Sequence, residues 1–327
     1  MTVLVTGAAG FIGYHVSEAL LARGEHVIGV DVLNDYYDVN LKKARRDRLL
    51  AQPNFEFVQE DIVNRDAMFA LSDANPGVSL IIHLAAQAGV RYSLEDPFAY
   101  IESNVIGHLV MLEMCRRIEG LEHFVYASSS SVYGGNTKLP FSVEDPTDTP
   151  VSIYAATKKA DELMSHSYSH LFGIPATGLR FFTVYGPWGR PDMAAYIFLS
   201  KIMANKPISV FNNGDMMRDF TYIDDIVKGI LAVAGGPPSG DGAPHRVYNI
   251  GNNNSEPLMR FIGLIEEAAG KKAKIDFKPM QPGDVRATYA DITAIQKDFG
   301  FEPSTPIDNG IPNFVDWYCE YHGIGRN

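Results

Sequence analysis

Cysteine and long apolar runs are both scarce in this sequence. Cys115 and Cys319 are the only cysteines among 327 residues, too few for a disulfide framework or a structural zinc site, so we expect no metal. No stretch of 18 or more residues is continuously apolar, which excludes a conventional transmembrane helix and argues against a membrane partner. Met1 runs directly into an apolar segment, so we expect no signal peptide and a cytoplasmic location.

Positive charge is also in short supply. The chain has 28 Lys and Arg residues against 39 Asp and Glu residues, for a net charge of −11. A protein that binds nucleic acid through the phosphate backbone needs a basic face, so we expect no nucleic-acid partner. The deficit does not exclude a single nucleotide, because helix dipoles and a few arginines suffice to bind one.

Short apolar runs alternate with helical patterns through the first half of the chain. Such alternation, with strands that are apolar throughout, is typical of a parallel sheet covered by helices on both faces. We expect an α/β fold: a Rossmann-type doubly wound parallel sheet (residues 1–175, with later segments crossing back) and a smaller C-terminal α/β substrate lobe (176–327). The predicted strands of the large sheet are Val3–Thr6, His26–Asp31, Phe55–Gln59, Leu80–Leu84 and His123–Ser128. The predicted elements of the smaller lobe are strands Ile208–Phe211, Val247–Ile250 and Ile275–Lys278 and helices Pro257–Ala269 and Ile307–His322.

A glycine-rich segment follows the first predicted strand and opens the first predicted helix. Gly7, Gly10 and Gly13 stand three residues apart, unlike the G-x-G-x-x-G of ordinary dinucleotide-binding dehydrogenases. Glycine lets the backbone approach a pyrophosphate, and the helix N-terminus offers free N–H groups and the positive end of a dipole. We therefore predict that this turn binds a dinucleotide, with Phe11 and Ile12 among its contacts.

Asp31 ends the second predicted strand, 18 residues after Gly13. A carboxylate at this place accepts hydrogen bonds from both hydroxyls of an adenosine ribose and repels a 2′-phosphate, which favours NAD over NADP. No basic residue follows Asp31 immediately. The remaining predicted cofactor contacts come from later strand ends and neighbouring segments: Asn34, Asp61, Ile62, Leu84, Ala85, Ala86 and Phe181.

Tyr154 and Lys158 are four residues apart, so on a helix they project from one face. An ammonium beside a phenol favours the phenolate, which makes tyrosine a usable base. The pair alone is a weak signal, because a chain with 16 tyrosines can contain this spacing by chance. Upstream, however, a run of serines at 128–131 ends an apolar strand, where a hydroxyl can hydrogen-bond a substrate alcohol.

Three motifs together resemble the extended short-chain dehydrogenase/reductases: TGAAGFIG at 6–13, the serine run before VYG at 132–134, and YAATK at 154–158. The segments QAGVRYS at 87–93, LRFFTVYGPWGRPDM at 179–193 and QPGD at 281–284 are similar to UDP-glucuronate 4-epimerases. The resemblance covers essentially the whole chain. It implies reversible C4 epimerisation of UDP-glucuronate to UDP-galacturonate through a 4-keto intermediate, with transient hydride transfer to bound NAD. In that family the tyrosine, here Tyr154, is the base, the lysine, here Lys158, holds tyrosine and ribose, and Ser129 assists.

The resemblance also implies a substrate site that extends into the smaller lobe. Ser209, Val210 and Phe211 would border the uracil, Arg218 would pair with a phosphate, and Asp284 would bind the uridine ribose. The other implied substrate contacts are Gln87, Arg91, Ser130, Ser131, Thr183, Arg190 and Gln281.

Several of these side chains have a plainer explanation. Arg218 could pair with its neighbour Asp219, Phe211 could belong to the core, and Arg91 could be a solvated helix charge. Arg190, implied to pair with the sugar carboxylate, could instead brace its Gly- and Pro-rich loop.

Other functions stay open at this point. A UDP-glucuronate decarboxylase, a 4,6-dehydratase or another UDP-sugar 4-epimerase would share the fold, and a non-catalytic NAD-binding regulator could use the same scaffold. Ser131 stands where the decarboxylases and 4,6-dehydratases carry Glu, which favours an epimerase. The complete set of Ser129, Tyr154 and Lys158 argues against a regulator. The helices near 97–117 and 153–172 resemble those of a four-helix dimer interface, so we expect a homodimer.

Overall fold

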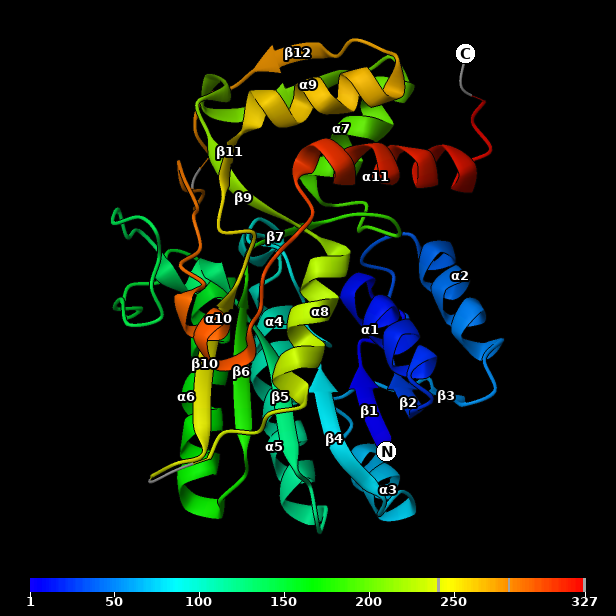
Figure 1. The fold of residues 1–327 in the computed structure, drawn as a ribbon, viewed down its shortest axis with the longest axis vertical. Helices are drawn as coiled ribbons and strands as arrows, with labels where there is room; N and C mark the ends of the chain where they lie inside the picture. The colour runs from blue at the N-terminus through cyan, green and yellow to red at the C-terminus, as the bar shows by residue number, and fades with distance from the viewer. Residues whose placement is uncertain (240–241, 282, 326–327) are drawn as a thin grey trace.

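The structure, a computed structural model, describes residues 1–239, 242–281 and 283–325. Pro282 of the predicted QPGD motif lies outside the described residues. Figure 1 shows two lobes: a large lobe built on a central sheet, where the chain begins, and a smaller lobe above it that holds the C-terminal helix α11 (Ile307–Tyr321).

The large lobe contains a seven-stranded sheet. Its strands are β1 (Thr2–Thr6), β2 (His26–Val30), β3 (Phe55–Val58), β4 (Val78–His83), β5 (His123–Ser129), β6 (Ala176–Phe181) and β10 (His245–Ile250). They lie in the order β3-β2-β1-β4-β5-β6-β10, and every neighbouring pair is parallel. The order runs outward from β1 in both directions, as in doubly wound dinucleotide-binding folds. The predicted Rossmann-type sheet is therefore confirmed.

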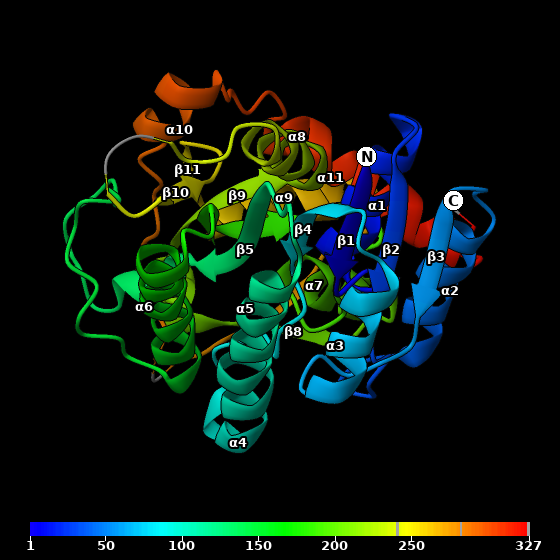
Figure 2. The same cartoon turned by 90° about the horizontal axis from the view of Figure 1, so that it is seen from below.

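Helices cover both faces of this sheet. They are α1 (Phe11–Ala22), α2 (Val39–Leu50), α3 (Arg65–Ala74), α4 (Pro97–Tyr100), a π-helical turn (Ile101–Ile106), α5 (Gly107–Arg117), α6 (Ile153–Phe172) and α8 (Ile223–Ala234). Figure 2 shows α1 and α8 on one face and α3, α5 and α6 on the other. Successive side chains of a strand point to opposite faces, so Val3 and Val5 of β1 belong to one apolar core and Leu4 to a second. All three are fully buried.

The smaller lobe combines short strands with helices. Its elements are β7 (Thr183–Tyr185), α7 (Ala194–Met203), β8 (Pro207–Val210), β9 (Met217–Tyr222), β11 (Ser255–Pro257), α9 (Leu258–Ala269), β12 (Lys274–Phe277) and α11. β12 pairs in parallel with β8, and β9 lies between β7 and β11. Helix α9 packs against α7 and α11, whereas α10 (Thr293–Phe299) returns to the large lobe beside β10.

Two strands that follow residue 175 belong to the large sheet. β6 and β10 form one edge of it, and β10 pairs with β6 over its whole length. The sequence pattern placed Val247–Ile250 in the smaller lobe, and this placement is wrong. Paired residues such as Ala176 and His245 are 69 positions apart, and a short apolar strand carries no local signal for the sheet that it joins.

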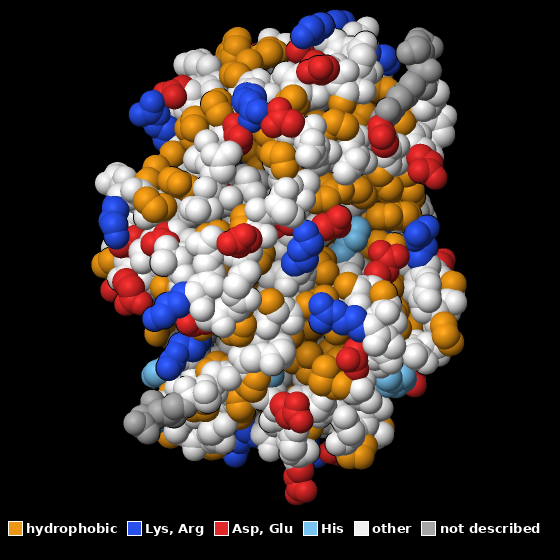
Figure 3. Space-filling model, in the orientation of Figure 1, with side chains coloured by type: hydrophobic (Ala, Val, Ile, Leu, Met, Phe, Trp, Pro, Cys, Tyr) orange, Lys and Arg blue, Asp and Glu red, His pale blue; other side chains and the backbone are white. Residues whose placement is uncertain are grey.

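Two kinds of feature are absent from the part of the molecule that the structure describes, and a third is absent from one of its faces. In the described part of the chain no helix is long and apolar enough to cross a membrane. Among the same residues no group of three or more His, Cys, Asp or Glu side chains is placed to hold a metal ion. On the face shown in Figure 3, basic and acidic side chains are interspersed, so this face presents no basic patch for a phosphate backbone.

Candidate active site

A cavity of about 490 Å³ is lined by residues of both lobes, and its volume is in the usual range for a small-molecule site. Its walls come from the glycine-rich turn, the carboxyl ends of β2 to β5, helix α6 and, in the smaller lobe, Arg218 and Asp284. A second cavity of about 140 Å³ shares Thr183, Arg218 and Asp284 with it. Doubly wound folds bind nucleotides at the carboxyl edge of the sheet. The cavity therefore connects that edge to the smaller lobe.

The glycine-rich turn between β1 and α1 is closely packed along its backbone. Gly7 has a φ of +70°, and a Cβ there would come within 2.8 Å of the Ala85 nitrogen. A Cβ on Gly13 would lie 2.0 Å from the Gly7 carbonyl oxygen. Gly10 caps α1 without a side-chain hydrogen bond, so no cap competes for the first N–H groups of the helix, which can bind an anion. The turn fits the pyrophosphate of a dinucleotide.

Asp31 follows β2, and its side chain lines the cavity. Its Oδ2 accepts the Ala9 N–H at 3.1 Å and its Oδ1 accepts the Leu33 N–H at 2.8 Å. Burial raises the pKa of Asp31, while these backbone donors and the charges of Lys42 and Arg45 lower it. The carboxylate is thus fixed between the glycine-rich turn and the loop after β2, where it fits the predicted contact with the adenosine ribose.

Lys42 is a cavity residue that the sequence analysis missed. It lies on α2, and its Nζ donates to the carbonyl oxygen of Asn34 at 2.7 Å and to the Asn34 side chain. Burial lowers the pKa of Lys42 to about 8, opposed by the charge of Asp31. Nothing in the spacing marks this lysine, because the loop before α2 determines where it points. The cofactor contacts predicted from the sequence all line the cavity: Gly7, Gly10, Phe11, Ile12, Gly13, Asp31, Asn34, Asp61, Ile62, Leu84, Ala85, Ala86, Tyr154, Lys158 and Phe181.

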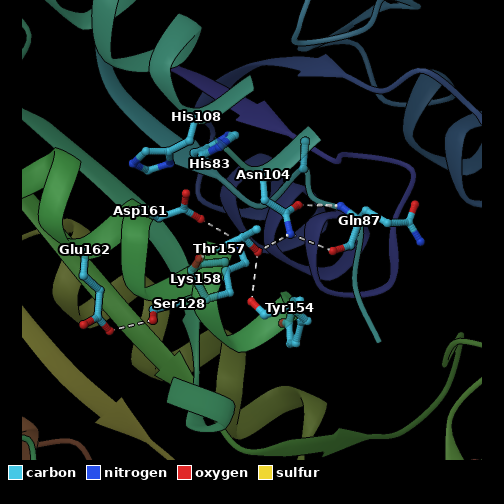
Figure 4. Close-up of polar contacts among 12 residues, drawn as sticks. His83, Gln87, Asn104, His108, Ser128, Tyr154, Thr157, Lys158, Asp161 and Glu162 are labelled. Atoms are coloured by element: carbon cyan, nitrogen blue, oxygen red, sulfur yellow. Dashed lines mark hydrogen bonds and ion pairs between the residues drawn. The ribbon is translucent and has the colours of Figure 1, made fainter. Parts of the chain in front are cut away.

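The predicted catalytic residues line the same cavity, where β5 meets α6; Figure 4 shows Tyr154 and Lys158 on α6. Tyr154 and Lys158 lie one turn apart on α6, and Ser129 ends β5. The Lys158 Nζ donates to the carbonyl oxygen of Ala127 and to the Asp161 carboxylate, both at 3.0 Å. The Ser129 Oγ accepts the N–H of residue 131 at 3.1 Å, which leaves its hydroxyl proton available for a substrate oxygen.

Local contacts set Tyr154 in the first turn of its helix. Ser152 caps α6, and its Oγ accepts the Ala155 N–H at 3.1 Å, the pattern expected of an N-cap serine. The ring of Tyr100 meets the Tyr154 ring edge to face, with 5.9 Å between centroids. Tyr154 is therefore held from both its backbone and its ring.

A buried asparagine connects the catalytic helix to the loop after β4 (Figure 4). Asn104 lies in the π-helical turn before α5. Its Oδ1 accepts the Gln87 N–H at 2.8 Å, and its Nδ2 donates to the Gln87 carbonyl oxygen and to the Thr157 Oγ1, each at 3.0 Å. Thr157 in turn donates to the carbonyl oxygen of Tyr154 at 2.9 Å. Asn104 could not be identified from the sequence, because its contacts depend on a π-helical turn that no local pattern predicts.

Arg218 and Asp284, implied to contact different parts of a nucleotide, form an ion pair with each other. The Arg218 Nη2 lies 2.7 Å from the Asp284 Oδ1, and the same guanidinium donates to backbone carbonyl oxygens of the segment after Asp284. The alternative pairing with Asp219 does not occur: Asp219 accepts the N–H groups of Asn252 and Ala290. Both partners of the pair line the large cavity and the small one.

The small cavity gathers most of the implied uracil contacts. Arg91, Ser209 and Phe211 line it, and the Arg91 guanidinium lies 4.8 Å from the centroid of the Phe211 ring. Val210 does not line the small cavity. Successive side chains of a strand point to opposite faces, and that of Val210 points into the core, where it is fully buried. Gln281 also lies outside the lining of both cavities, where its carbonyl oxygen accepts the N–H of residue 284.

Arg190 lines the large cavity with its guanidinium already engaged by Asp192. Its Nε donates to the Asp192 Oδ1 at 3.0 Å and its Nη2 to the Oδ2, and the Tyr36 hydroxyl donates to the same carboxylate at 3.2 Å. An arginine has five N–H donors, so Asp192 orients Arg190 without using all of them. The other implied substrate contacts that line this cavity are Gln87, Ser129, Ser130, Ser131 and Thr183.

Another arginine, Arg45, is buried and joins two loops of the site. Arg45, on α2, donates from Nη1 to the Ala9 carbonyl oxygen in the glycine-rich turn at 3.0 Å. Its Nη2 donates to the carbonyl oxygens of Trp188 and Gly189 at 2.6 and 3.3 Å, in the loop that carries Arg190. The side chain is fully buried. One guanidinium therefore fixes the glycine-rich turn relative to the Arg190 loop.

The chain is similar to several known proteins over nearly its whole length. An Escherichia coli O111:H- protein, an uncharacterized 37.6 kDa protein in the cld 5′ region, is 51% identical over 99% of this chain and 100% of that protein. UDP-glucuronate 4-epimerase 4 of Arabidopsis thaliana is 48% identical over 98% of this chain and 76% of that protein. The crystal structure of UDP-glucuronic acid 4-epimerase from Bacillus cereus, in complex with UDP-glucuronic acid and NAD, matches with a TM-score of 0.91. Its identity is 34%, over 98% of this chain and 100% of that one.

A family model described as the NAD dependent epimerase/dehydratase family matches residues 3–251. The match includes the glycine-rich turn, Asp31, the serine run and the Tyr154–Lys158 pair. By sequence and by fold, the chain belongs to the NAD-dependent epimerase/dehydratase family.

Proposed function

We propose that the protein is an NAD-dependent epimerase that interconverts UDP-glucuronate and UDP-galacturonate at C4. The observation that carries the proposal is one cavity that joins a dinucleotide cradle to Arg218 and Asp284, with Ser129, Tyr154 and Lys158 on its wall. The relatives support this substrate, since the Arabidopsis and B. cereus proteins are UDP-glucuronate 4-epimerases.

Each catalytic side chain has a distinct role in this reaction. Tyr154 accepts the proton of the C4 hydroxyl and returns it after the 4-keto sugar has rotated to present its other face. Ser129 donates a hydrogen bond to the C4 oxygen. Lys158 favours the phenolate through its positive charge and presents an N–H donor to the cofactor ribose. When bound, NAD supplies the hydride acceptor and donor that makes a net non-redox inversion possible.

An epimerase must also retain the sugar carboxylate, because a C4 ketone makes it a β-keto acid that tends to lose carbon dioxide. Arg190, oriented by Asp192, and Ser131 lie on the cavity wall and can hold this carboxylate still. The acidic residues that line the described cavity are Asp31, Glu60, Asp61 and Asp284. None of them belongs to the serine segment before VYG, where decarboxylases and 4,6-dehydratases carry their acid. This difference supports epimerisation over those reactions.

An NMR time course of UDP-glucuronate with the purified enzyme tests the proposal. We expect UDP-galacturonate signals to appear without loss of carbon dioxide or accumulation of a 4-keto-6-deoxy sugar. Parallel incubation with UDP-glucose distinguishes a general UDP-sugar 4-epimerase. A mainly UDP-pentose product would favour a decarboxylase, and no turnover of any UDP-sugar would favour a non-catalytic NAD-binding protein.

We further propose that the enzyme is a homodimer that packs residues 97–117 (α4, the π-helical turn and α5) and α6 of one chain against the same segments of another. Helices α5 and α6 contact each other. Between residues 94 and 109 and between 163 and 172, large apolar side chains are 40% to 77% exposed: Leu94, Phe98, Ile101, Ile106, Leu109, Leu163, Leu171 and Phe172. Soluble monomers rarely expose so much apolar surface in one region. A second copy presents the same helices, as an isologous interface requires.

Sedimentation equilibrium tests the dimer. The wild-type chain of 36.0 kDa should sediment at twice that mass, and the double variant Phe98→Glu, Leu163→Glu should sediment as a monomer. Leu50→Glu on α2, also at an exposed leucine, is the matched control and should stay dimeric. A monomeric wild type at micromolar concentration would contradict the proposal.

We also propose a cytoplasmic location. Cys115 and Cys319 are both buried and unpaired, which suits a reducing compartment. Cell fractionation with marker enzymes tests this, and recovery in a secreted or membrane fraction would contradict it.

A further inference from the structure

We propose that Asp161 is a positioning residue for the epimerisation: its carboxylate holds the Lys158 ammonium from the buried side and offsets part of the charge that Lys158 presents to Tyr154. The inference rests on the proposed epimerase activity and extends it to a residue outside the cavity wall. Asp161 follows Lys158 by three positions on α6 and is not among the residues that line the cavity.

The hydrogen bonds of Lys158 show how Asp161 directs it. An ammonium has three N–H donors. Lys158 uses one on the Ala127 carbonyl oxygen and one on the Asp161 Oδ2, each at 3.0 Å. Both side chains of the pair are interior, with 3% of Lys158 and 0% of Asp161 exposed. One donor therefore remains for the cavity, and the two buried contacts determine where it points.

The positive charge next to the Asp161 carboxylate is that of Lys158. Burial raises the pKa of Asp161 to about 7, although Lys158 lowers it. His108 of α5 lies against the Asp161 backbone, and the ring of His83 of β4 lies 5.3 Å from that of His108. Burial lowers the pKa of both histidines, to about 3 for His83. Both rings are therefore neutral where the enzyme works, and neither shares the role of Lys158.

The other titratable groups near Asp161 are engaged elsewhere. Glu162, the next residue of α6, accepts hydrogen bonds from Arg180 at 2.8 and 2.9 Å. Tyr126 of β5 stays protonated, because burial and the nearby Glu162 and Asp161 raise its pKa. The Asp161 Oδ1 has no hydrogen-bond partner among the described residues. A buried carboxylate with a bare oxygen is costly, and such a cost beside a catalytic lysine points to an electrostatic role.

The consequence is an influence on the pH range of the reaction. Tyr154 lies seven residues before Asp161 on α6, two turns or about 10 Å along the axis. Above about pH 7, where Asp161 is ionised, its full charge at that separation changes an ionisation by roughly one pH unit at an effective dielectric constant near 20. The Asp161 charge opposes the Tyr154 phenolate and supports the Lys158 ammonium. Its removal should therefore move both limbs of the pH–rate profile to lower pH.

The experiment compares pH profiles of charge-changing and charge-keeping variants. Asp161→Asn keeps the size of the side chain and a hydrogen-bond acceptor but removes the charge. We expect the limb of its kcat/KM profile that depends on Tyr154, measured with UDP-glucuronate on NAD-loaded enzyme, to move lower by roughly one pH unit. The limb that depends on Lys158 should move further, because Lys158 lies 3.0 Å from Asp161. Asp161→Glu keeps the charge and should keep the wild-type profile.

Asp225→Asn on α8 is the matched control. Asp225 is also fully buried and pairs with Lys228 at the same i, i+3 spacing, but neither residue lines the cavity. This variant should lose stability without any shift of the pH profile. A shift equal to that of Asp161→Asn would show a general effect of charge and overturn the inference.

A profile for Asp161→Asn that superimposes on the wild type would also overturn the inference, even if the variant melts at a lower temperature. If the amide variant does not fold, Asp161→Ser removes the same charge with a smaller side chain and carries the same test. Failure of the wild-type enzyme to turn over UDP-glucuronate would instead contradict the proposed function, so the two failures are distinguishable.

Discussion

Replacing Gly13 by alanine should cost the enzyme both stability and bound NAD. The added Cβ would lie 2.0 Å from the Gly7 carbonyl oxygen, 2.7 Å from the Gly7 carbonyl carbon and 3.1 Å from the Ala8 Cα. All three are backbone atoms, and non-bonded heavy atoms normally stay near roughly 3.5 Å, so the turn has to open. The same Gly7 oxygen accepts the Gly10 N–H at 2.9 Å. The shift therefore disrupts the cradle for the pyrophosphate.

Two opposing effects set the size of this loss. Overpacking of a close contact destabilises the folded protein by about 1–3 kcal/mol. Alanine in place of glycine within a helix normally stabilises the folded protein by about 1 kcal/mol. Gly263→Ala on α9 is the matched control, because its Cβ would meet nothing within 4 Å, and it should raise Tm by about 2 °C. Thermal unfolding and the NAD released on denaturation measure both effects. A Gly13→Ala enzyme that copurifies with a full complement of NAD and melts no lower than the wild type would refute the reasoning.

Three further substitutions test the site. Tyr154→Phe removes the proton acceptor and should lower kcat by about 10²- to 10⁴-fold while calorimetry still detects UDP-sugar binding; near-normal turnover would rule out Tyr154 as the base. Asp31→Ala removes the ribose acceptor and the partner of the Ala9 and Leu33 N–H groups, so copurified NAD should fall at least about 10-fold; NADP in the wild-type enzyme would contradict the assignment. Arg190→Gln should weaken UDP-glucuronate binding far more than UDP-glucose binding and release some UDP-pentose, seen by NMR. An unchanged preference between the two sugars would mean that Arg190 only braces its loop.

Much of the fold could be predicted because its signals are local. The apolar run before Gly7 predicts a strand at Val3–Thr6, and the observed β1 begins one residue earlier. The helix that the glycine-rich segment is predicted to open is likewise present, as α1. The choice of partner strand is not local. β10 has the same apolar character in either lobe, and only its pairing with β6, contributed by a distant part of the chain, places it in the large sheet.

The site divides in the same way. Gly7, Asp31 and Tyr154 could be identified because the chemistry requires those residue types at fixed distances from strand ends or from one another. Lys42 and Asn104 could not, since a loop and a π-helical turn decide where their side chains point. The ion pairs of the site could not be predicted from the sequence either. Arg218 pairs with Asp284, which is 66 positions away, and not with the adjacent Asp219.

The buried guanidinium of Arg45 connects two binding loops of the cavity, and we expect this connection to couple the binding of their ligands. It bonds the backbone of both the glycine-rich turn and the Arg190 loop, so a ligand that stabilises either loop also stabilises the other. Coupling between two binding sites is reciprocal. The factor by which the sugar nucleotide would tighten dinucleotide binding therefore equals the factor by which the dinucleotide would tighten sugar-nucleotide binding. An epimerase ends each turnover with its cofactor unchanged and has no need to exchange it. We therefore expect this linkage to retain the dinucleotide while the reactive 4-keto sugar is present, and to confine its exchange to the enzyme without sugar nucleotide.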